Sequence, residues 1–354
     1  MRCPILSTRE LRQAIELVPR IRLAHLPTPL EEVRRFAAAL GGPRLFLKRD
    51  DCTGLLFGGN KTRHNEFLLA DALRQNADVV VWGAGVQSNN CRQTAAACNK
   101  LGLECHLYLS RASHNDDIQG NLLLDHLMGA KVTIVDAPIG PGVDQILLAE
   151  AEKLRRAGRR PYVWDRCTGR PLGAASYLLC LAEIIDQLRD ESLEPAAIYV
   201  ASAGATGAGL ALGRVVLGLR CPVRLVSPIP WPWDVRADLA EVANQTAALL
   251  RLPHRLTADD VDLTEDHIGP AYGTVTAAGR EAIRLLAHSE GILLDPVYTA
   301  KGMAGLIADV RQGRFPPEAV VVFIHTGGTP AVFAYRDELL APVGDQGTAH
   351  RAHS

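Results

Sequence analysis

The chain has 354 residues, and 38 Lys and Arg against 39 Asp and Glu give it a formal net charge of −1. This balance argues against a strongly basic nucleic-acid-binding surface and against an acidic solvating tail. Hydrophobic residues make up 47% and charged residues 22%, as in folded globular proteins. The length exceeds what one hydrophobic core usually serves, so two lobes are expected.

The chain contains no apolar run of roughly 18 residues, so no membrane span is expected. Its first residues, Met1-Arg2-Cys3-Pro4, lead into polar residues without the apolar core of a signal peptide. The eight cysteines are scattered singly, with no CxxC pair, so neither a metal site nor a disulfide framework is expected. These features favour a reduced, cytoplasmic protein.

Short β-branched runs alternate with longer amphipathic runs along the chain. The expected strands are Arg44–Lys48, Asp78–Trp82, Glu104–Leu109, Lys131–Val135, Ala197–Val200, Arg224–Pro228 and Ala319–His325. The expected helices between them include Glu66–Gln75, Gln93–Leu101, Gln119–Met128 and Gln145–Ala157. Strands that are apolar on both faces and separated by helices predict an α/β fold with parallel sheets covered on both sides.

The expected strands form one set before about residue 140 and another after about residue 195. The stretch Gly158-Arg159-Arg160-Pro161 is expected at the surface between the two sets, because its glycine and proline break the preceding helix. Gly344–Ser354 holds small and polar residues and is expected to fray.

In open parallel sheets, ligands bind beyond the carboxyl ends of the strands, so the loops there are the candidate site. The first loop, Gly58-Gly59-Asn60-Lys61-Thr62, precedes a helix. Gly54 and Gly59 have the spacing of a nucleotide-binding GxxxxGK[ST] loop, but Asn60 displaces the lysine by one position. Lys61 would then lie in the first turn of a helix, where the dipole disfavours a cation by roughly 0.3–1 kcal/mol. That field favours the neutral amine that a Schiff-base lysine needs, although a solvated surface lysine fits the same pattern.

Two further loops join a strand to a helix. In the loop Gly83–Asn90, Ser88 replaces the third glycine of a dinucleotide-binding motif. Ser88-Asn89-Asn90 is expected to begin a helix, and this helix start either binds a carboxylate or is simply capped. Ser202–Gly209 is rich in small residues and contains Thr206, which predicts a phosphate cup or close packing of helix on strand.

The fourth loop, Ile324–Pro330, follows the last expected strand. Its glycine pair lets a flat ligand approach the backbone and Thr326 offers a hydroxyl, whereas His325 is expected to be packed in the protein. Tyr272 and Tyr298 occur in turn-like contexts, and either one alone would be interpreted as structural.

Taken together, six ordered motifs resemble the D-cysteine desulfhydrase and 1-aminocyclopropane-1-carboxylate (ACC) deaminase group. These are pyridoxal-phosphate enzymes with the fold of the tryptophan synthase β subunit. The motifs are Lys48-Arg49-Asp50-Asp51, Gly58-Gly59-Asn60-Lys61-Thr62-Arg63, Gln87-Ser88-Asn89, Arg92-Gln93-Thr94-Ala95-Ala96, Asp295-Pro296-Val297-Tyr298 and His325-Thr326-Gly327-Gly328. The resemblance extends from about Arg20 to Tyr335.

The resemblance implies a two-lobed α/β fold of that type, each lobe a mainly parallel sheet flanked by helices. It places a large cofactor-binding domain at residues 1–56 and 168–340, a small domain at 57–167 and a flexible tail at 341–354. It also implies pyridoxal 5'-phosphate as cofactor, a small amino acid as substrate and a homodimer, with no metal, nucleic acid or membrane partner.

Residue roles follow from the matched motifs. Lys61 matches the lysine that binds the cofactor covalently and serves as a base, Ser88 a residue that assists proton transfer, and Tyr272 and Tyr298 two active-site tyrosines. Cofactor contacts are expected from Asn60, Lys61, Thr326 and the phosphate cup, which comprises Ala203, Gly204, Ala205, Thr206 and Gly207. Substrate contacts are expected from Gln87, Ser88, Asn89 and Asn90.

The departures from the group bear on the substrate. ACC deaminases carry glutamate where this chain has Thr299, and they tend to lack the threonine present here as Thr326; both differences favour a desulfhydrase. Asn90 stands where desulfhydrases and cysteate sulfo-lyases usually have histidine, and His64-Asn65 replaces a basic–leucine pair. In Cys167-Thr168-Gly169-Arg170-Pro171, Arg170 is expected either to meet an anionic substrate group such as a sulfonate or to lie on the surface.

The sequence therefore predicts a pyridoxal-phosphate-dependent lyase or deaminase, in first place a D-cysteine desulfhydrase that forms pyruvate, ammonia and sulfide. L-Cysteate sulfo-lyase and ACC deaminase are alternatives within the group. A nucleotide-binding hydrolase and a non-catalytic cofactor carrier are alternatives outside it.

Overall fold

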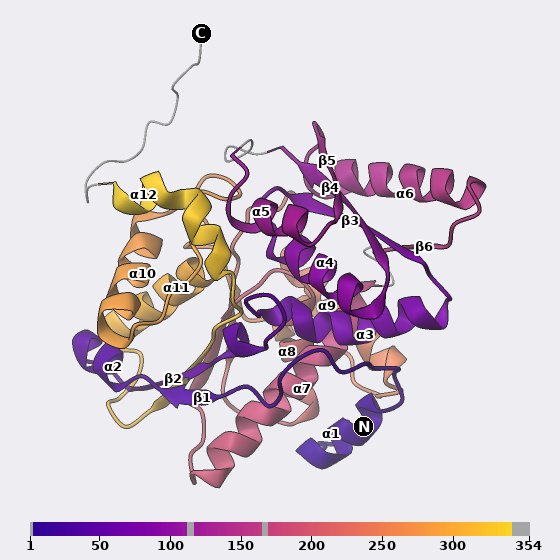
Figure 1. Cartoon of the computed structure of the whole chain (residues 1–354). Coiled ribbons are helices and arrows are strands. Elements are labelled where there is room, and N and C mark those ends of the chain that lie inside the picture. The colour runs from indigo at the N-terminus through magenta and orange to yellow at the C-terminus, as the bar shows by residue number, and fades with distance from the viewer. Residues whose placement is uncertain (1–2, 112–116, 165–168, 342–354) are drawn as a thin grey trace.

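The computed structural model describes residues 3–111, 117–164 and 169–341 (Figure 1). The expected flexible tail, apart from Ala341, lies outside the described residues, as do Met1-Arg2 and Cys167-Thr168.

The described strands form a six-stranded and a four-stranded sheet. The larger has the order β1-β2-β10-β7-β8-β9 and the smaller the order β5-β4-β3-β6. The strands of the larger sheet are β1 (Leu30–Glu32), β2 (Arg44–Lys48), β7 (Ala197–Ala201), β8 (Val223–Val226), β9 (Leu263–Thr264) and β10 (Val320–Ile324). Those of the smaller sheet are β3 (Val79–Gly85), β4 (Glu104–Ser110), β5 (Lys131–Val135) and β6 (Pro161–Val163).

Every described strand pair is parallel except β1 with β2. Strand β10 lies in the middle of the larger sheet, where Val321 pairs with Leu45 of β2 and with Ala197 of β7. All residues of β10 are buried, so it is an uninterrupted apolar run.

Helices cover both faces of each sheet. The α-helices are α1 (Thr8–Ile15), α2 (Arg34–Leu40), α3 (Asn60–Arg74), α4 (Asn89–Leu101), α5 (Gly120–Leu127), α6 (Pro141–Arg156), α7 (Gly169–Asp190), α8 (Ala205–Val216), α9 (Val235–Leu249), α10 (Ala277–Glu290), α11 (Thr299–Arg311) and α12 (Arg336–Leu340). Short 3-10 helices are η1 (Asp50–Cys52), η2 (Ala258–Asp260) and η3 (Thr329–Tyr335). No described helix combines the length and apolarity needed to span a membrane.

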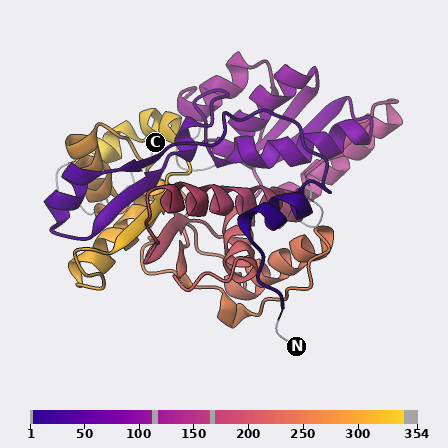
Figure 2. The ribbon, with the colours of Figure 1, turned by 90° about the horizontal axis from the view of Figure 1, so that it is seen from below.

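The layers follow from the apolar clusters. One face of the larger sheet packs with α7, α8 and α9, and the other with α2, α10 and α11. The smaller sheet packs on one face with α3 and α4 and on the other with α6. Helix α1 buries Leu11 and Ile15 against α7, and Figure 2 shows it beside that helix. The predicted two-lobed α/β fold is confirmed.

Each of the seven predicted strands is present, and the strands missed by sequence analysis, β1, β6 and β9, are edge strands of two or three residues. The predicted division near residues 140 and 195 is wrong in two places. Strand β2 pairs with β10 in the larger sheet. Strand β6 follows Gly158-Arg159-Arg160 directly and pairs with β3 in the smaller sheet. Strand pairing depends on contacts between distant residues, which a local pattern does not contain.

Three helices begin before the ranges predicted from apolar periodicity: α3 at Asn60 rather than Glu66, α4 at Asn89 rather than Gln93, and α6 at Pro141 rather than Gln145. The first turns of α3 and α4 carry polar residues, so the apolar pattern starts about one turn too late. The loop motifs, in contrast, predicted Lys61 in the first turn of a helix and Ser88-Asn89-Asn90 at a helix start, and both predictions are confirmed.

Candidate active site

A cavity of 220 Å³ lies at the carboxyl ends of strands from both sheets. Its wall combines the ends of β3 and β7, the loops after β8 and β10, and the first turns of α3, α4 and α8. Parallel strands direct their carboxyl ends to one edge, which is why loops far apart in sequence meet here.

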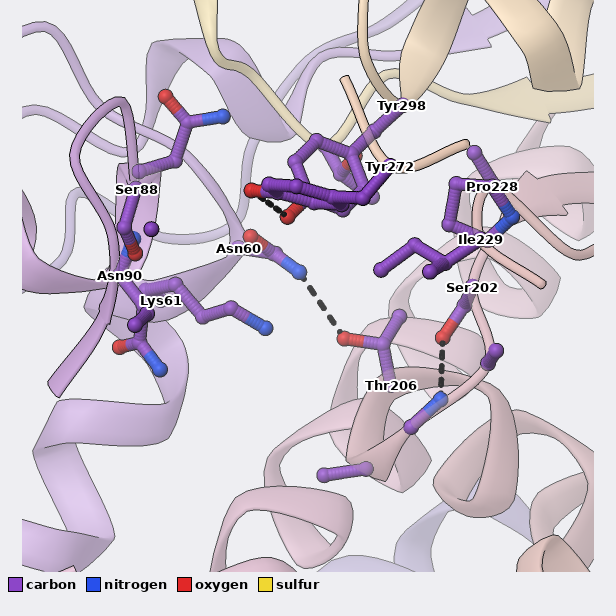
Figure 3. Close-up of a pocket in the computed structure, with 18 of the residues that line it drawn as sticks. Asn60, Lys61, Ser88, Asn90, Ser202, Thr206, Pro228, Ile229, Tyr272 and Tyr298 are labelled. Carbon is purple, nitrogen blue, oxygen red and sulfur yellow. Dashed lines mark hydrogen bonds between the residues drawn. The ribbon is translucent and has the colours of Figure 1, made fainter. Parts of the chain in front are cut away.

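Lys61 projects from the first turn of α3 into this cavity (Figure 3). Among the described residues, no hydrogen-bond or ion-pair partner contacts its ammonium group. Burial without a counter-charge disfavours the cation and lowers the pKa of Lys61 to about 8. The sequence also predicted that the neutral amine of Lys61 is favoured, but it attributed this to the helix dipole, whereas the cause in the structure is burial. A substantial fraction of this amine is therefore neutral near physiological pH, as a nucleophile or base requires.

The loop between β7 and α8 forms a cup of backbone N–H groups opposite Lys61. Ser202 Oγ accepts hydrogen bonds from the N–H of Gly204 at 3.3 Å and of Gly207 at 2.9 Å. The N-cap Gly204 has no side chain to cap α8, so the N–H groups of Ala205 and Thr206, the first two of this helix, stay available to an anion. A Cβ placed on Gly204 would meet no atom within 4 Å, so this wall opens onto free space.

Thr206 joins the cup to α3. The Asn60 side-chain amide donates to Thr206 Oγ1 at 3.0 Å, and His64 Nε2 lies 3.0 Å from the same oxygen. Burial, followed by the nearby charges of Lys61 and Arg63, lowers the pKa of His64 well below its usual value, so its ring is neutral. The replacement His64, noted as a departure from the group, therefore contacts the cup without adding charge.

The loop after β10 packs tightly against the loop before α3. A Cβ on Gly327 would lie 2.7 Å from Gly59 Cα, so only glycine permits this approach. The Asn60 N–H donates to the Thr326 carbonyl at 3.0 Å, which fixes Thr326 on the cavity wall. His325 is packed as predicted: its Nδ1 accepts from the Gly327 N–H at 3.2 Å, and its Nε2 lies 2.9 Å from the Leu293 carbonyl.

The beginning of α4 forms the wall beside Lys61. Ser88 is the N-cap, and its Oγ accepts from the N–H groups of Asn90 and Cys91, each at 3.2 Å. Asn89 Oδ1 accepts from Asn121 at 2.8 Å, which orients the amide of Asn89. Ser88 thus caps the helix and also lines the cavity, so the two interpretations given by the sequence are compatible.

The two tyrosines lie together above the cavity (Figure 3). Their hydroxyls are 3.0 Å apart, and both residues line the wall. Burial raises the pKa of Tyr272 to about 12 and that of Tyr298 well above its usual value. Both therefore stay protonated at neutral pH. One proton is shared between them, and the other remains free to be donated.

Thr299 lies outside the cavity wall although it follows Tyr298 directly. Its side chain is fully buried and donates to Asp295 Oδ1 at 2.8 Å. Asp295 also accepts from the backbone N–H groups of Val297 and Tyr298, at 3.1 and 3.0 Å. Asp295 thereby holds the start of α11, and position 299 supplies no acid to the cavity.

The structure brings together all but two of the residues predicted for the site. The predicted residues in the wall are Asn60, Lys61, Ser88, Asn89, Asn90, Ala203, Gly204, Ala205, Thr206, Tyr272, Tyr298 and Thr326. Gly207 lies behind the cup, with its N–H bonded to Ser202. Gln87 also lies outside the wall, because its side chain binds the Gln119 carbonyl and the Asn121 N–H.

Sequence analysis missed a group of wall residues after β8. Pro228, Ile229 and Trp231 lie opposite Lys61 in the cavity. They follow the carboxyl end of a predicted strand, so the strand-end rule would have found them. It also missed that Arg170 binds Asp238 through two hydrogen bonds, of 2.8 and 2.5 Å.

These features fit one cofactor class: an unpartnered lysine for an aldehyde, an uncapped helix start for a phosphate, and a glycine-lined slot for a flat ring. The family model described as pyridoxal-phosphate dependent enzyme matches residues 21–327. The chain belongs to this family of pyridoxal-phosphate-dependent enzymes.

Two curated relatives are bacterial D-cysteine desulfhydrases. The one from Klebsiella pneumoniae (strain 342) is 40% identical over 334 residues, covering 92% of this chain and 99% of the relative. The one from Salmonella typhi is 41% identical over 327 residues, covering 90% and 96%.

Solved structures support the same fold. The crystal structure of an ACC deaminase homologue matches with a TM-score of 0.85 and 33% identity, covering 93% of this chain and 98% of that one. Diaminopropionate ammonia lyase from Escherichia coli, at 17% identity and a TM-score of 0.67 over 96% and 94% of the two chains, shares the fold.

Proposed function

We propose that this chain is a pyridoxal-phosphate-dependent carbon–sulfur lyase that converts D-cysteine to pyruvate, ammonia and sulfide. The observation that carries the proposal is the unpartnered Lys61 amine between the phosphate cup and the start of α4. The two D-cysteine desulfhydrases at 40 and 41% identity support this substrate.

Lys61 would hold the cofactor aldehyde, Ala203–Thr206 its phosphate, and Thr326 and Asn60 the ring. When bound, pyridoxal phosphate supplies the electron sink that stabilises negative charge at the substrate Cα. Thr326 offers the ring only a neutral hydroxyl, which withdraws less charge than a carboxylate-held pyridinium would and favours loss of a β-substituent.

The remaining residues of the cavity handle the substrate. The substrate carboxylate would bind the Asn89 N–H and the side chains of Ser88–Asn90 at the start of α4. Lys61, released in its neutral form, would take the proton from Cα, with Ser88 beside it. The Tyr272–Tyr298 pair, which stays protonated, would donate its free proton to the departing sulfur.

Two features disfavour the alternatives within the group. ACC ring opening would draw on an acid after Tyr298, but Thr299 is buried against Asp295. A sulfonate would call for a free cation, but both guanidinium hydrogen bonds of Arg170 go to Asp238.

Lys61→Ala tests the assignment of the lysine. We expect kcat to fall by roughly 10³-fold or more, because both the covalent attachment and the base are removed. Borohydride reduction of the wild type followed by peptide mapping should find the cofactor on Lys61, and on no peptide of the variant. Lys153→Ala, which changes an exposed lysine of α6, is the control. Cofactor trapped on another lysine would contradict the proposal.

A substrate panel tests the reaction: D-cysteine, L-cysteine, L-cysteate, ACC, D-serine and β-chloroalanine, scored for pyruvate, 2-oxobutyrate, sulfide and sulfite. We expect D-cysteine to give pyruvate and sulfide with the highest kcat/KM. Preferential formation of 2-oxobutyrate from ACC, or of sulfite from L-cysteate, would replace the proposed activity by one of the two alternatives.

We further propose that the chain forms a cytoplasmic homodimer. Exposed apolar side chains support a dimer: Leu123 and Leu127 of α5 are 40 and 65% exposed, and Phe333 of η3 is 67% exposed. The two elements pack so closely that a Cβ on Gly120 would lie 3.0 Å from the Pro330 carbonyl oxygen and 3.3 Å from Ala334 Cβ. Light scattering of the purified protein measures the oligomeric state.

A further inference from the structure

A second cavity, of 240 Å³, adjoins the one just described. Lys61, Asn90, Trp231 and residues 203–205 line both, so the two spaces meet at the reacting amine. The second cavity extends from this junction past His64 towards Arg170 and Asp238. We call it the aromatic cavity, because four tryptophan side chains contribute to its wall.

All four tryptophans of the chain line the aromatic cavity: Trp82, Trp164, Trp231 and Trp233. They come from the middle of β3, the residue after β6 and the loop before α9. Trp82 and Trp164 pack edge to face with ring centroids 4.6 Å apart, and Trp231 and Trp233 stack at 4.5 Å. Two rigid aromatic pairs thus form the walls beside a catalytic lysine, although only 5% of the chain is aromatic.

The polar groups of the aromatic cavity carry little free charge. Arg170 and Asp238 neutralise each other through two hydrogen bonds. His64 is neutral and lies against Thr206. A charged occupant would therefore find no free counter-ion among the described wall residues beyond the reacting amine, whereas an apolar ring would find aromatic faces on two sides.

The size also suits one aromatic ring. A dry apolar cavity of about 150 Å³ binds benzene, so 240 Å³ accommodates a benzyl group. A cysteine alone has nothing to place there, because its sulfur ends one bond beyond Cβ.

We propose that the aromatic cavity receives an aryl or arylalkyl group carried on the substrate sulfur, so that this chain cleaves S-substituted cysteines. The inference rests on the proposed lyase function and names its substrate class. With the substrate carboxylate on Ser88–Asn90 and Cα beside Lys61, the sulfur substituent would extend past Asn90 between the two tryptophan pairs.

The reaction needs only water as a co-reactant. The Cα proton is removed, the Cβ–S bond breaks with its electron pair leaving on sulfur, and the thiolate takes up a proton. The remaining enamine becomes an imine, which water hydrolyses to pyruvate and ammonia. S-Benzylcysteine and water thus give pyruvate, ammonia and benzyl thiol, with no oxidant or reductant.

Binding can be measured without turnover by using 3-(benzylsulfanyl)propanoate, which lacks the amino group. Because every tryptophan lines the cavity, intrinsic fluorescence reports on it directly. We expect a saturable fluorescence change in the wild type and a Kd raised about 10-fold or more in Trp233→Ala. Trp233→Phe should recover most of the affinity, because it keeps an aromatic face. Absence of saturable binding to the wild type would overturn the proposal.

Kinetics provide the second test, with both enantiomers of S-benzylcysteine compared against D-cysteine. In Trp233→Ala and Trp82→Ala, the ratio of kcat/KM for S-benzylcysteine to that for D-cysteine should fall, by about 10-fold in the former. Phe315→Ala, which removes a ring packed on Tyr199 away from both cavities, is the control.

The outcomes separate the two proposals. If the enzyme converts D-cysteine but does not cleave S-benzylcysteine, the aromatic cavity is not a substrate site, and the proposed lyase function is unaffected. An unchanged ratio in both tryptophan variants does the same. Failure to process either compound overturns both proposals.

Discussion

Two cations in the first turns of α3, the buried Arg63 and the partly buried Lys61, have pKa values that are shifted in opposite directions. Arg63 is 1% exposed, yet it donates to Asp50 at 2.8 Å and to Glu183 at 2.7 Å, and these carboxylates raise its pKa well above the usual value. Lys61, two residues earlier, has no such partner within the described structure, and burial lowers its pKa to about 8.

The comparison shows that the partner, more than the burial, decides the state of a cation. Around Arg63, the carboxylates offset desolvation and the ion pairs hold α3 on the larger sheet and α7. Around Lys61, desolvation is uncompensated, which costs stability but leaves a reactive amine. The buried ion pairs thereby anchor the helix that presents the lysine.

Removing Arg63, the cation that is paired with carboxylates, should give the largest change in the free energy of unfolding. Arg63→Leu would leave Asp50 buried without its main partner, so we expect the free energy of unfolding to fall by about 3–5 kcal/mol. Urea denaturation measures this. Arg63→Leu combined with Asp50→Asn should recover part of the loss, because the orphaned charge is removed. A change below about 1 kcal/mol in the single variant would show that the pairs add no stability.

Removing the unpaired cation should have a smaller effect of opposite sign. In Lys61→Met, the apoprotein should be more stable than the wild type at pH 7, because the wild type bears the cost of a desolvated ammonium. The pKa of Lys61 is about 8 in the folded protein, against 10.5 for an unperturbed lysine, so the unfolded chain binds more protons between these values.

Wild-type stability should therefore rise relative to the variant as the pH increases from about 8 to 10.5, by at most about 1.4 kcal/mol per pH unit. Denaturation curves of the two apoproteins across this range measure the difference. A difference that is independent of pH would mean that the Lys61 amine is not desolvated in the folded protein.

An exposed ion pair should have the smallest effect on the free energy of unfolding. Arg311 and Glu281 lie 2.5 Å apart, and both side chains are 50% exposed. Because water screens this pair, Arg311→Met should change the free energy of unfolding by no more than about 1 kcal/mol. A loss as large as that of Arg63→Leu would undermine the contrast between buried and exposed pairs.

Much of the fold was predictable because it depends on local signals. The interior strands, such as β10, are apolar runs bounded by turn residues, and each was found. The edge strands β1, β6 and β9 are too short to carry a pattern. The local pattern also could not predict to which sheet β2 belongs, because its neighbour β10 is more than 270 residues away in the chain.

The site divides in the same way. Lys61, Ser88, Thr206 and Thr326 stand in loops with recognisable composition, and they line one cavity. Trp231 lies just beyond a predicted strand and could have been found by the strand-end rule, whereas neither the Asp238 partner of Arg170 nor the Asp295 partner of Thr299 can be inferred from spacing.

By itself, the sequence determined that parallel strands alternate with helices and that glycine-rich loops and one lysine stand at the strand ends, because these are properties of neighbouring residues. Only the tertiary structure decided which charges are neutralised, that Thr299 is buried outside the cavity and where the four tryptophans gather. Those outcomes depend on burial and on contacts between distant segments, and both come into existence only when the chain packs.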